Sequence, residues 1–118
     1  MDELIGRLVA NVGVERNVAE QAVVIILDFL RKEAPEQANK LISEMPGAEA
    51  LIAANPPAAG GFAMPGLMGA GTKLMGIGLS MGQVQAVTRE MLAFAREKAG
   101  EDAVGEVVGA IPGLSQFA

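Results

Sequence analysis

The sequence predicts an all-α protein: a single compact helical bundle of two duplicated three-helix units joined by a Pro/Gly-rich connector. Three observations support this. The 118 residues are 51% hydrophobic, enough for one buried core at a common domain size. Only 3% are aromatic, so the core depends on Leu, Ile, Val, Met and Ala, which suit interdigitating helices better than strands. The chain also matches itself along its length.

The internal match appears at an offset of 65 residues. It pairs turn glycines, such as Gly13 with Gly78, and apolar residues, such as Phe29 with Phe94. One added residue later places the Pro-Gly pair at 46–47 on that at 112–113. Chance matches rarely keep both kinds of position in register, so we predict a duplication within one domain. Unit 1 is expected at about 2–47, the connector at about 48–66 and unit 2 at about 67–113.

Each unit is expected to hold three helices in the same order. A short helix (about 2–11 and 67–77) ends at a glycine suited to a left-handed C-cap, and a long helix follows (about 17–33 and 81–99). A third helix (about 35–44 and 101–110) stops at the Pro-Gly pair. Inside the connector, residues 50–53 add one helical turn before Asn55-Pro56-Pro57 ends it.

The long helix of unit 1 has a wide apolar face of roughly 200°, where a surface helix needs about 100°. Val24 falls inside its polar arc, beside Asp28, which Arg31 and Lys32 can pair with. One interpretation is a central helix covered by the rest of the chain. The other is an interface that Val24 and Asp28 share with a partner.

A second candidate surface is the Met/Gly segment, which contains Met64, Met68, Met75 and Met81 among glycines. Flexible thioethers either fill a core or form a pliable apolar binding surface. A Cu(I) site is disfavoured, because copper sites usually add Cys or His and the chain has neither.

The residue inventory excludes most chemistry. A net charge of −5 and a pI near 4.6 disfavour nucleic acid as a partner. Without His or Cys there is no Ser-His-Asp machinery, no thiolate nucleophile and no common transition-metal ligand. The acids Glu101 and Asp102 fit a helix N-terminus instead. We therefore expect no enzyme, no cofactor, no metal and no integral membrane span.

The order of short motifs resembles the VcgC/VcgE family of uncharacterised bacterial helical proteins. The resemblance covers nearly the whole chain and rests on Leu4-Ile5, Val12-Gly13-Val14, the run from Met45 to Ala54, the Gly-rich connector and Gly76-Ile77-Gly78-Leu79-Ser80. It implies a bacterial helical protein and transfers no catalytic or binding residue. Such families often carry an export signal, whereas this sequence starts directly at the first helix. As given, the chain predicts a cytoplasmic protein, and a periplasmic one if a signal was removed.

Two functional hypotheses follow from these patterns. The first is a non-enzymatic protein-interaction or scaffolding domain, with a homodimer through the helix around Val24 as its specific form. The alternative is binding of an apolar small molecule or lipid between the two units, with the Met/Gly segment as a lid.

Overall fold

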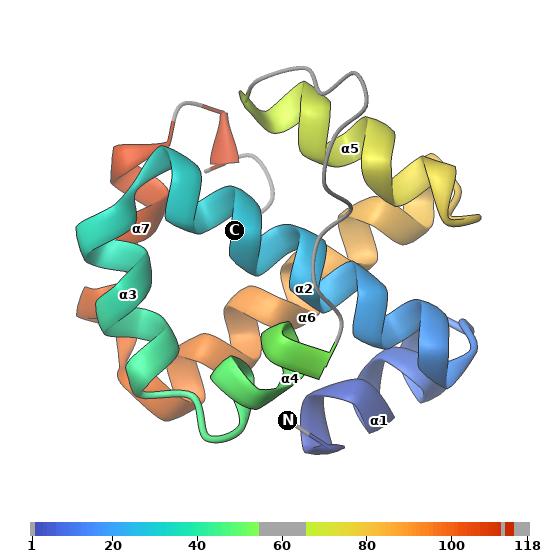
Figure 1. Ribbon diagram of the computed structural model, residues 1–118, viewed down its shortest axis with the longest axis horizontal. Helices are drawn as coiled ribbons and strands as arrows, with labels where there is room; N and C mark the ends of the chain where they lie inside the picture. The colour runs from blue at the N-terminus through green and yellow to red at the C-terminus, as the bar shows by residue number, and fades with distance from the viewer. Residues whose placement is uncertain (1, 55–65, 112, 115–118) are drawn as a thin grey trace.

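The computed structural model describes residues 2–54, 66–111 and 113–114, and this part of the chain forms seven α-helices and no strand (Figure 1). Its extents of 32 × 30 × 27 Å are those of one compact body. Because all regular elements of the described residues are helices, the predicted all-α class is confirmed. The helices are α1 (Asp2–Asn11), α2 (Arg16–Glu33), α3 (Pro35–Ser43), α4 (Ala48–Ala54), α5 (Gly66–Gly76), α6 (Met81–Ala99) and α7 (Glu101–Ala110).

Helix α2 is the centre of the bundle. It packs against α1, α3, α4, α5 and α6, and Figure 1 shows it crossing the middle of the molecule with α6 behind it. Its buried residues surround most of the helix axis, as the wide apolar face predicts; they are Ala19, Ala22, Val23, Val24, Ile26, Leu27, Phe29 and Leu30. One apolar cluster joins these residues, apart from Val24, to the buried faces of the other helices.

The contacts between helices show the same pattern when each helix of predicted unit 1 is compared with its counterpart in predicted unit 2. The pair α1 and α2 corresponds to α5 and α6, the pair α2 and α3 to α6 and α7, and the pair α1 and α6 to α5 and α2. The pairs α2–α6 and α3–α7 correspond to themselves. Gly13 and Gly78, matched in the sequence, both have a positive φ, at 81° and 106°. A duplication predicts this arrangement, but common ancestry itself stays a prediction.

The predicted connector begins with a helix that the sequence interpretation reduced to a single turn. Helix α4 runs from Ala48 to Ala54, packs on α2 and α3, and buries Ala48 completely. The chain at 48–54 is therefore part of the bundle. Residues 55–65, the remainder of the predicted connector, lie outside the described part of the chain.

Candidate apolar pocket

A pocket of about 310 Å³ lies between α2, α5 and α6. Its lining is mainly apolar and combines residues from all three helices with Leu114 from the C-terminal turn. The lining residues are Ile26, Phe29, Ala70, Gly71, Thr72, Leu74, Met75, Met81, Val84, Gln85, Thr88 and Leu114. A cavity of this volume is at the lower end of the range of small-molecule sites, which begins at about 300 Å³.

The pocket exists because α5 carries small residues where its predicted counterpart carries large ones. Helix α1 packs against α2 and α6 through Leu4 and Ile5, which are 0% and 1% exposed. At the offset of 65 these residues correspond to Gly69 and Ala70 on α5. Well-packed interiors leave few voids larger than a water molecule, so this loss of side-chain volume leaves space that α5 does not fill.

The two matched phenylalanines show the same difference. Phe94 is 2% exposed and lies beneath the Arg7 guanidinium, whose carbon is 5.6 Å from the ring centroid. Phe29 lines the pocket instead. The counterpart of Arg7 is Thr72, whose short side chain lacks the cation and the length to cover a ring in this way. An aromatic ring is therefore left to line the space between α2 and α5.

Two methionines with large exposed surfaces stand at the pocket. Met75 at the end of α5 is 49% exposed and Met81 at the start of α6 is 64% exposed. They are the most exposed of the large hydrophobic side chains in the described residues, and both line the pocket. Methionine has three rotatable bonds and adapts to varied apolar shapes. The pair forms what we call the methionine rim.

The polar side chains of the pocket are uncharged. Thr88 is buried, and its Oγ1 donates a 2.9 Å hydrogen bond to the Val84 carbonyl one turn earlier on α6. Gln85 is exposed. Thr72 is also exposed. The arrangement can hold an apolar compound and offer it a hydrogen bond near the surface, and its described lining contains no Asp, Glu, Lys or Arg.

Of the predicted site residues, Met75 lies in this pocket. Met68 belongs to α5, but its side chain is outside the described structure, and Met64 lies outside the described residues. The described part of the predicted lid is helix α5, which forms one wall of the pocket, and its role as a lid stays a prediction.

Val24 requires a correction. Of its two interpretations, an interface residue on the polar arc or part of a central helix covered by the rest of the chain, its 2% exposure agrees with the second and not with the first. Helical periodicity placed it on the polar side, but burial is decided by tertiary packing, which a single-helix projection does not contain. A second copy of the protein would find almost no surface of Val24 to contact.

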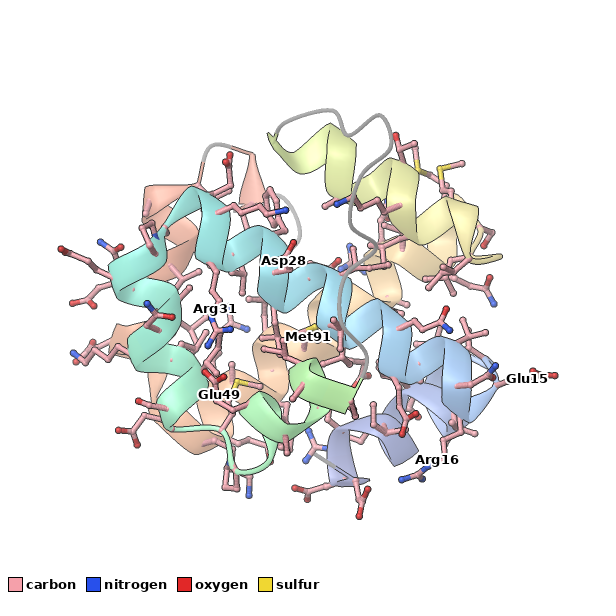
Figure 2. The ribbon with its side chains drawn as sticks, in the orientation of Figure 1. Glu15, Arg16, Asp28, Arg31, Glu49 and Met91 are labelled. Carbon is pink, nitrogen blue, oxygen red and sulfur yellow. The ribbon has the colours of Figure 1, made fainter. Side chains whose placement is uncertain are left out.

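Asp28 is a surface residue in an ion pair. Its side chain is 21% exposed, and Lys32 Nζ lies 2.9 Å from Asp28 Oδ2, one of the two pairings expected from the sequence. Arg31 pairs elsewhere: it donates to Glu49 on α4, and Figure 2 shows these two side chains meeting between α2 and α4. Asp28 thus contributes to neither the pocket nor a cluster of acids.

Sequence reasoning missed most of the pocket, including Phe29, Ala70, Gln85 and Thr88 as a group. A signal for part of it was present, because the offset of 65 aligns the large residues at 4–5 with the small residues at 69–70. Read as a difference in volume, this alignment would have indicated a gap in unit 2.

Within the described residues, no group of three His, Cys, Asp or Glu side chains is placed to hold a metal ion. None of the described helices has the length and hydropathy to cross a bilayer. Comparison with protein-family models, curated proteins and solved structures finds no match to this chain, so the VcgC/VcgE resemblance stays a prediction.

Proposed function

We propose that the protein is a non-enzymatic binding domain that holds an apolar small molecule or a single lipid chain in the pocket between α2, α5 and α6. The supporting observation is that the pocket and the methionine rim coincide. Exposed apolar surface on a soluble domain often marks a binding site, and here Met75 and Met81 stand at a pocket lined by Phe29 and Ile26.

The size of the pocket sets the size of the ligand. A dry apolar cavity of about 150 Å³ is large enough for benzene. The pocket has about twice that volume. The ligand is therefore a compound of roughly a dozen non-hydrogen atoms, or the end of a longer chain.

The test is titration of the protein with N-phenyl-1-naphthylamine, an uncharged probe whose fluorescence rises in apolar surroundings. It is larger than the pocket, so we expect its naphthalene ring system to occupy the pocket and its phenyl ring to remain at the opening. We expect saturable binding to the wild type and its loss in Gly71→Leu. Gly71 is a helical lining residue with open space around an added Cβ, so the leucine fills the pocket without a clash at its first atom.

Gly105→Leu is the matched control. Gly105 is also helical, is exposed on α7, has open space around an added Cβ and is not a lining residue. Binding that is absent from the wild type, or equal in the two leucine variants, would contradict the proposal. Native mass spectrometry of the purified protein would show whether a cellular ligand remains bound.

A second candidate is a protein partner, because Met81 exposes 64% of its surface. In this form, the homodimer predicted from the sequence would use the methionine rim rather than Val24. Sedimentation of the wild type and Met81→Glu distinguishes the two candidates. A concentration-dependent dimer that the glutamate abolishes supports the interface, and monomers in both samples at micromolar concentration contradict it.

A further inference from the structure

The methionines whose side chains the structure describes fall into two groups. Met45 and Met91 are core residues, 2% and 3% exposed, whereas Met75 and Met81 are 49% and 64% exposed. A thioether is oxidised when a dissolved oxidant reaches its sulfur, so exposure decides which methionines react first. Among these four, a peroxide in water therefore reaches the two methionines of the methionine rim first.

The surroundings of the methionine rim leave both thioethers open to water. Met75 is the penultimate residue of α5 and Met81 is the first residue of α6, so both stand at helix ends. Each is followed by an exposed glycine, Gly76 or Gly82, with open space where a Cβ would stand. An oxygen atom added to either sulfur can therefore point into water, and the fold does not have to change to accept it.

The same oxygen atom is unfavourable for an occupied pocket. Oxidation converts the flexible apolar side chain of methionine into a polar sulfoxide. Met75 and Met81 line the pocket, where an apolar ligand would cover part of their surface. Covering a sulfoxide removes its water while the ligand offers no hydrogen-bond donor in return. Turning the sulfoxide away from the ligand removes apolar contact instead, so either response weakens binding.

Building on the proposed function, we infer that the methionine rim is an oxidation site through which peroxides weaken binding in the pocket. The sulfur lone pair of Met75 or Met81 attacks one peroxide oxygen, an S–O bond forms and the O–O bond breaks. The sulfur loses two electrons. The other oxygen leaves, takes up the proton of the attacked oxygen and is released as water or, from an organic hydroperoxide, as an alcohol. Methionine sulfoxide reductases, with a thiol as the reductant, return the sulfoxide to the thioether.

Trypsin separates the methionines for measurement. Cleavage after Lys and Arg places Met75 and Met81 in peptide 74–89, which holds no other methionine, and Met91 in peptide 90–96. The protein is treated with increasing hydrogen peroxide and freed of oxidant. Each sample is then divided between peptide mass spectrometry and titration with N-phenyl-1-naphthylamine.

We expect peptide 74–89 to gain oxygen before peptide 90–96 does. Binding of the probe should weaken at least about tenfold as peptide 74–89 is oxidised, since one unsatisfied polar contact is enough for a change of that size. Incubation with sulfoxide reductases for both sulfoxide epimers and dithiothreitol should restore binding.

Variants assign the effect to the methionine rim. The double variant Met75→Leu, Met81→Leu keeps apolar side chains of similar volume, so it should bind the probe within a few-fold of the wild type and not respond to peroxide. The double variant Met75→Gln, Met81→Gln should bind as weakly as the oxidised wild type without treatment. Met91→Leu, at a buried position outside the lining of this pocket, is the control and should respond as the wild type does. Circular dichroism before and after treatment verifies that each protein is folded.

The outcomes separate this inference from the proposed function. Unchanged probe binding after oxidation of peptide 74–89 would overturn the inference while the pocket proposal stands. A peroxide response that persists in the leucine double variant, or equally rapid oxidation of Met91, would do the same. A wild type that does not bind the probe before any treatment would overturn the proposed function and the inference with it.

Discussion

Arg7 and Glu97 fasten the first helix to the sixth. Arg7 Nη1 donates to Glu97 Oε2 at 2.5 Å, and Arg7 Nη2 donates to Glu97 Oε1 at 2.8 Å. The Arg7 guanidinium lies over the buried Phe94 ring, and Lys98 Nζ is 5.5 Å from the centroid of that ring. The Arg7–Glu97 ion pair joins α1 to α6, whereas none of the described residues that line the pocket beside α5 and α2 is charged.

The Arg7–Glu97 pair predicts an acid-sensitive contribution to stability. The hydrogen bond from Arg7 lowers the pKa of the Glu97 carboxyl below its ordinary value of 4.5 and raises the pKa of Arg7. A carboxyl whose pKa is depressed in the folded state stabilises the fold above its unfolded pKa, and that contribution is lost as the pH falls through the folded pKa. We therefore expect the wild type to lose its stability advantage over Glu97→Gln below the ordinary pKa.

The measurement is the free energy of unfolding of both proteins in denaturant, from neutral pH to about pH 2. Glu106→Gln is the control, because Glu106 is exposed on α7 and forms no ion pair with the residues that the structure describes. Its stability curve should run parallel to that of the wild type. Parallel curves for Glu97→Gln would show that the pair contributes nothing.

We predict that position 100 tolerates only glycine. It separates α6 from α7 with φ 91° and ψ 161°, a region that residues with a Cβ almost never adopt. Gly100→Ala should lower the free energy of unfolding by about 1–3 kcal/mol. Gly105→Ala, in the interior of α7 with open space around the new methyl group, should raise it by about 0.5–1 kcal/mol. Equal effects of the two substitutions would contradict the backbone argument.

The helix boundaries were largely predictable because local chemistry determines them. The expected bounds for α1, α6 and α7 agree with the structure, those for α2 and α3 differ by one residue at one end, and those for α5 differ by one residue at both ends. Proline at the first turn of α3 and glycine after α6 are signals that do not depend on tertiary packing. Helix α4 was underestimated, because it is only seven residues long and its neighbours in the sequence indicate a loop.

The pocket was not predictable in the same way. It forms because the side chains between three helices have too little volume to fill the space. No single lining residue therefore indicates the pocket in the sequence. Met75 was singled out because several methionines stand among glycines in its segment, whereas Phe29 and Ile26 looked like ordinary core residues. Val24 was placed on the polar side of its helix because helical periodicity describes a single helix. Its burial depends on all the elements that pack around that helix.

We predict that the N-cap of α6, Ser80, makes a second local contribution to stability. Its hydroxyl accepts a hydrogen bond from the Gln83 backbone N–H at 3.2 Å, and the Gln83 side chain accepts one from the Ser80 N–H at 2.9 Å. Ser80→Ala should cost about 1 kcal/mol in chemical denaturation. The matched position is Glu15, the N-cap residue before α2, which makes no side-chain cap hydrogen bond, so Glu15→Ala should cost much less. Equal losses would show that the cap of α6 is not a specific stabilising feature.

The volume difference between α1 and α5 can be tested by exchanging one pair of matched residues. Ala70→Ile places in the pocket wall the side chain that Ile5 supplies in unit 1. Each methylene group buried there contributes about 0.8 kcal/mol, so the variant should be at least as stable as the wild type and should lose probe binding. Ile5→Ala should cost about 2–5 kcal/mol, because it removes a fully packed side chain.

Thermal unfolding and probe titration together decide the outcome. Ala110→Ile, at an exposed site at the end of α7, controls for added hydrophobicity and should leave probe binding unchanged. If Ala70→Ile destabilised the fold as much as Ile5→Ala, the space beside Ala70 would already be filled, since overpacking a complete core also costs about 1–3 kcal/mol. A stable Ala70→Ile variant without probe binding would locate the ligand between α5 and α2, where the two units differ in volume.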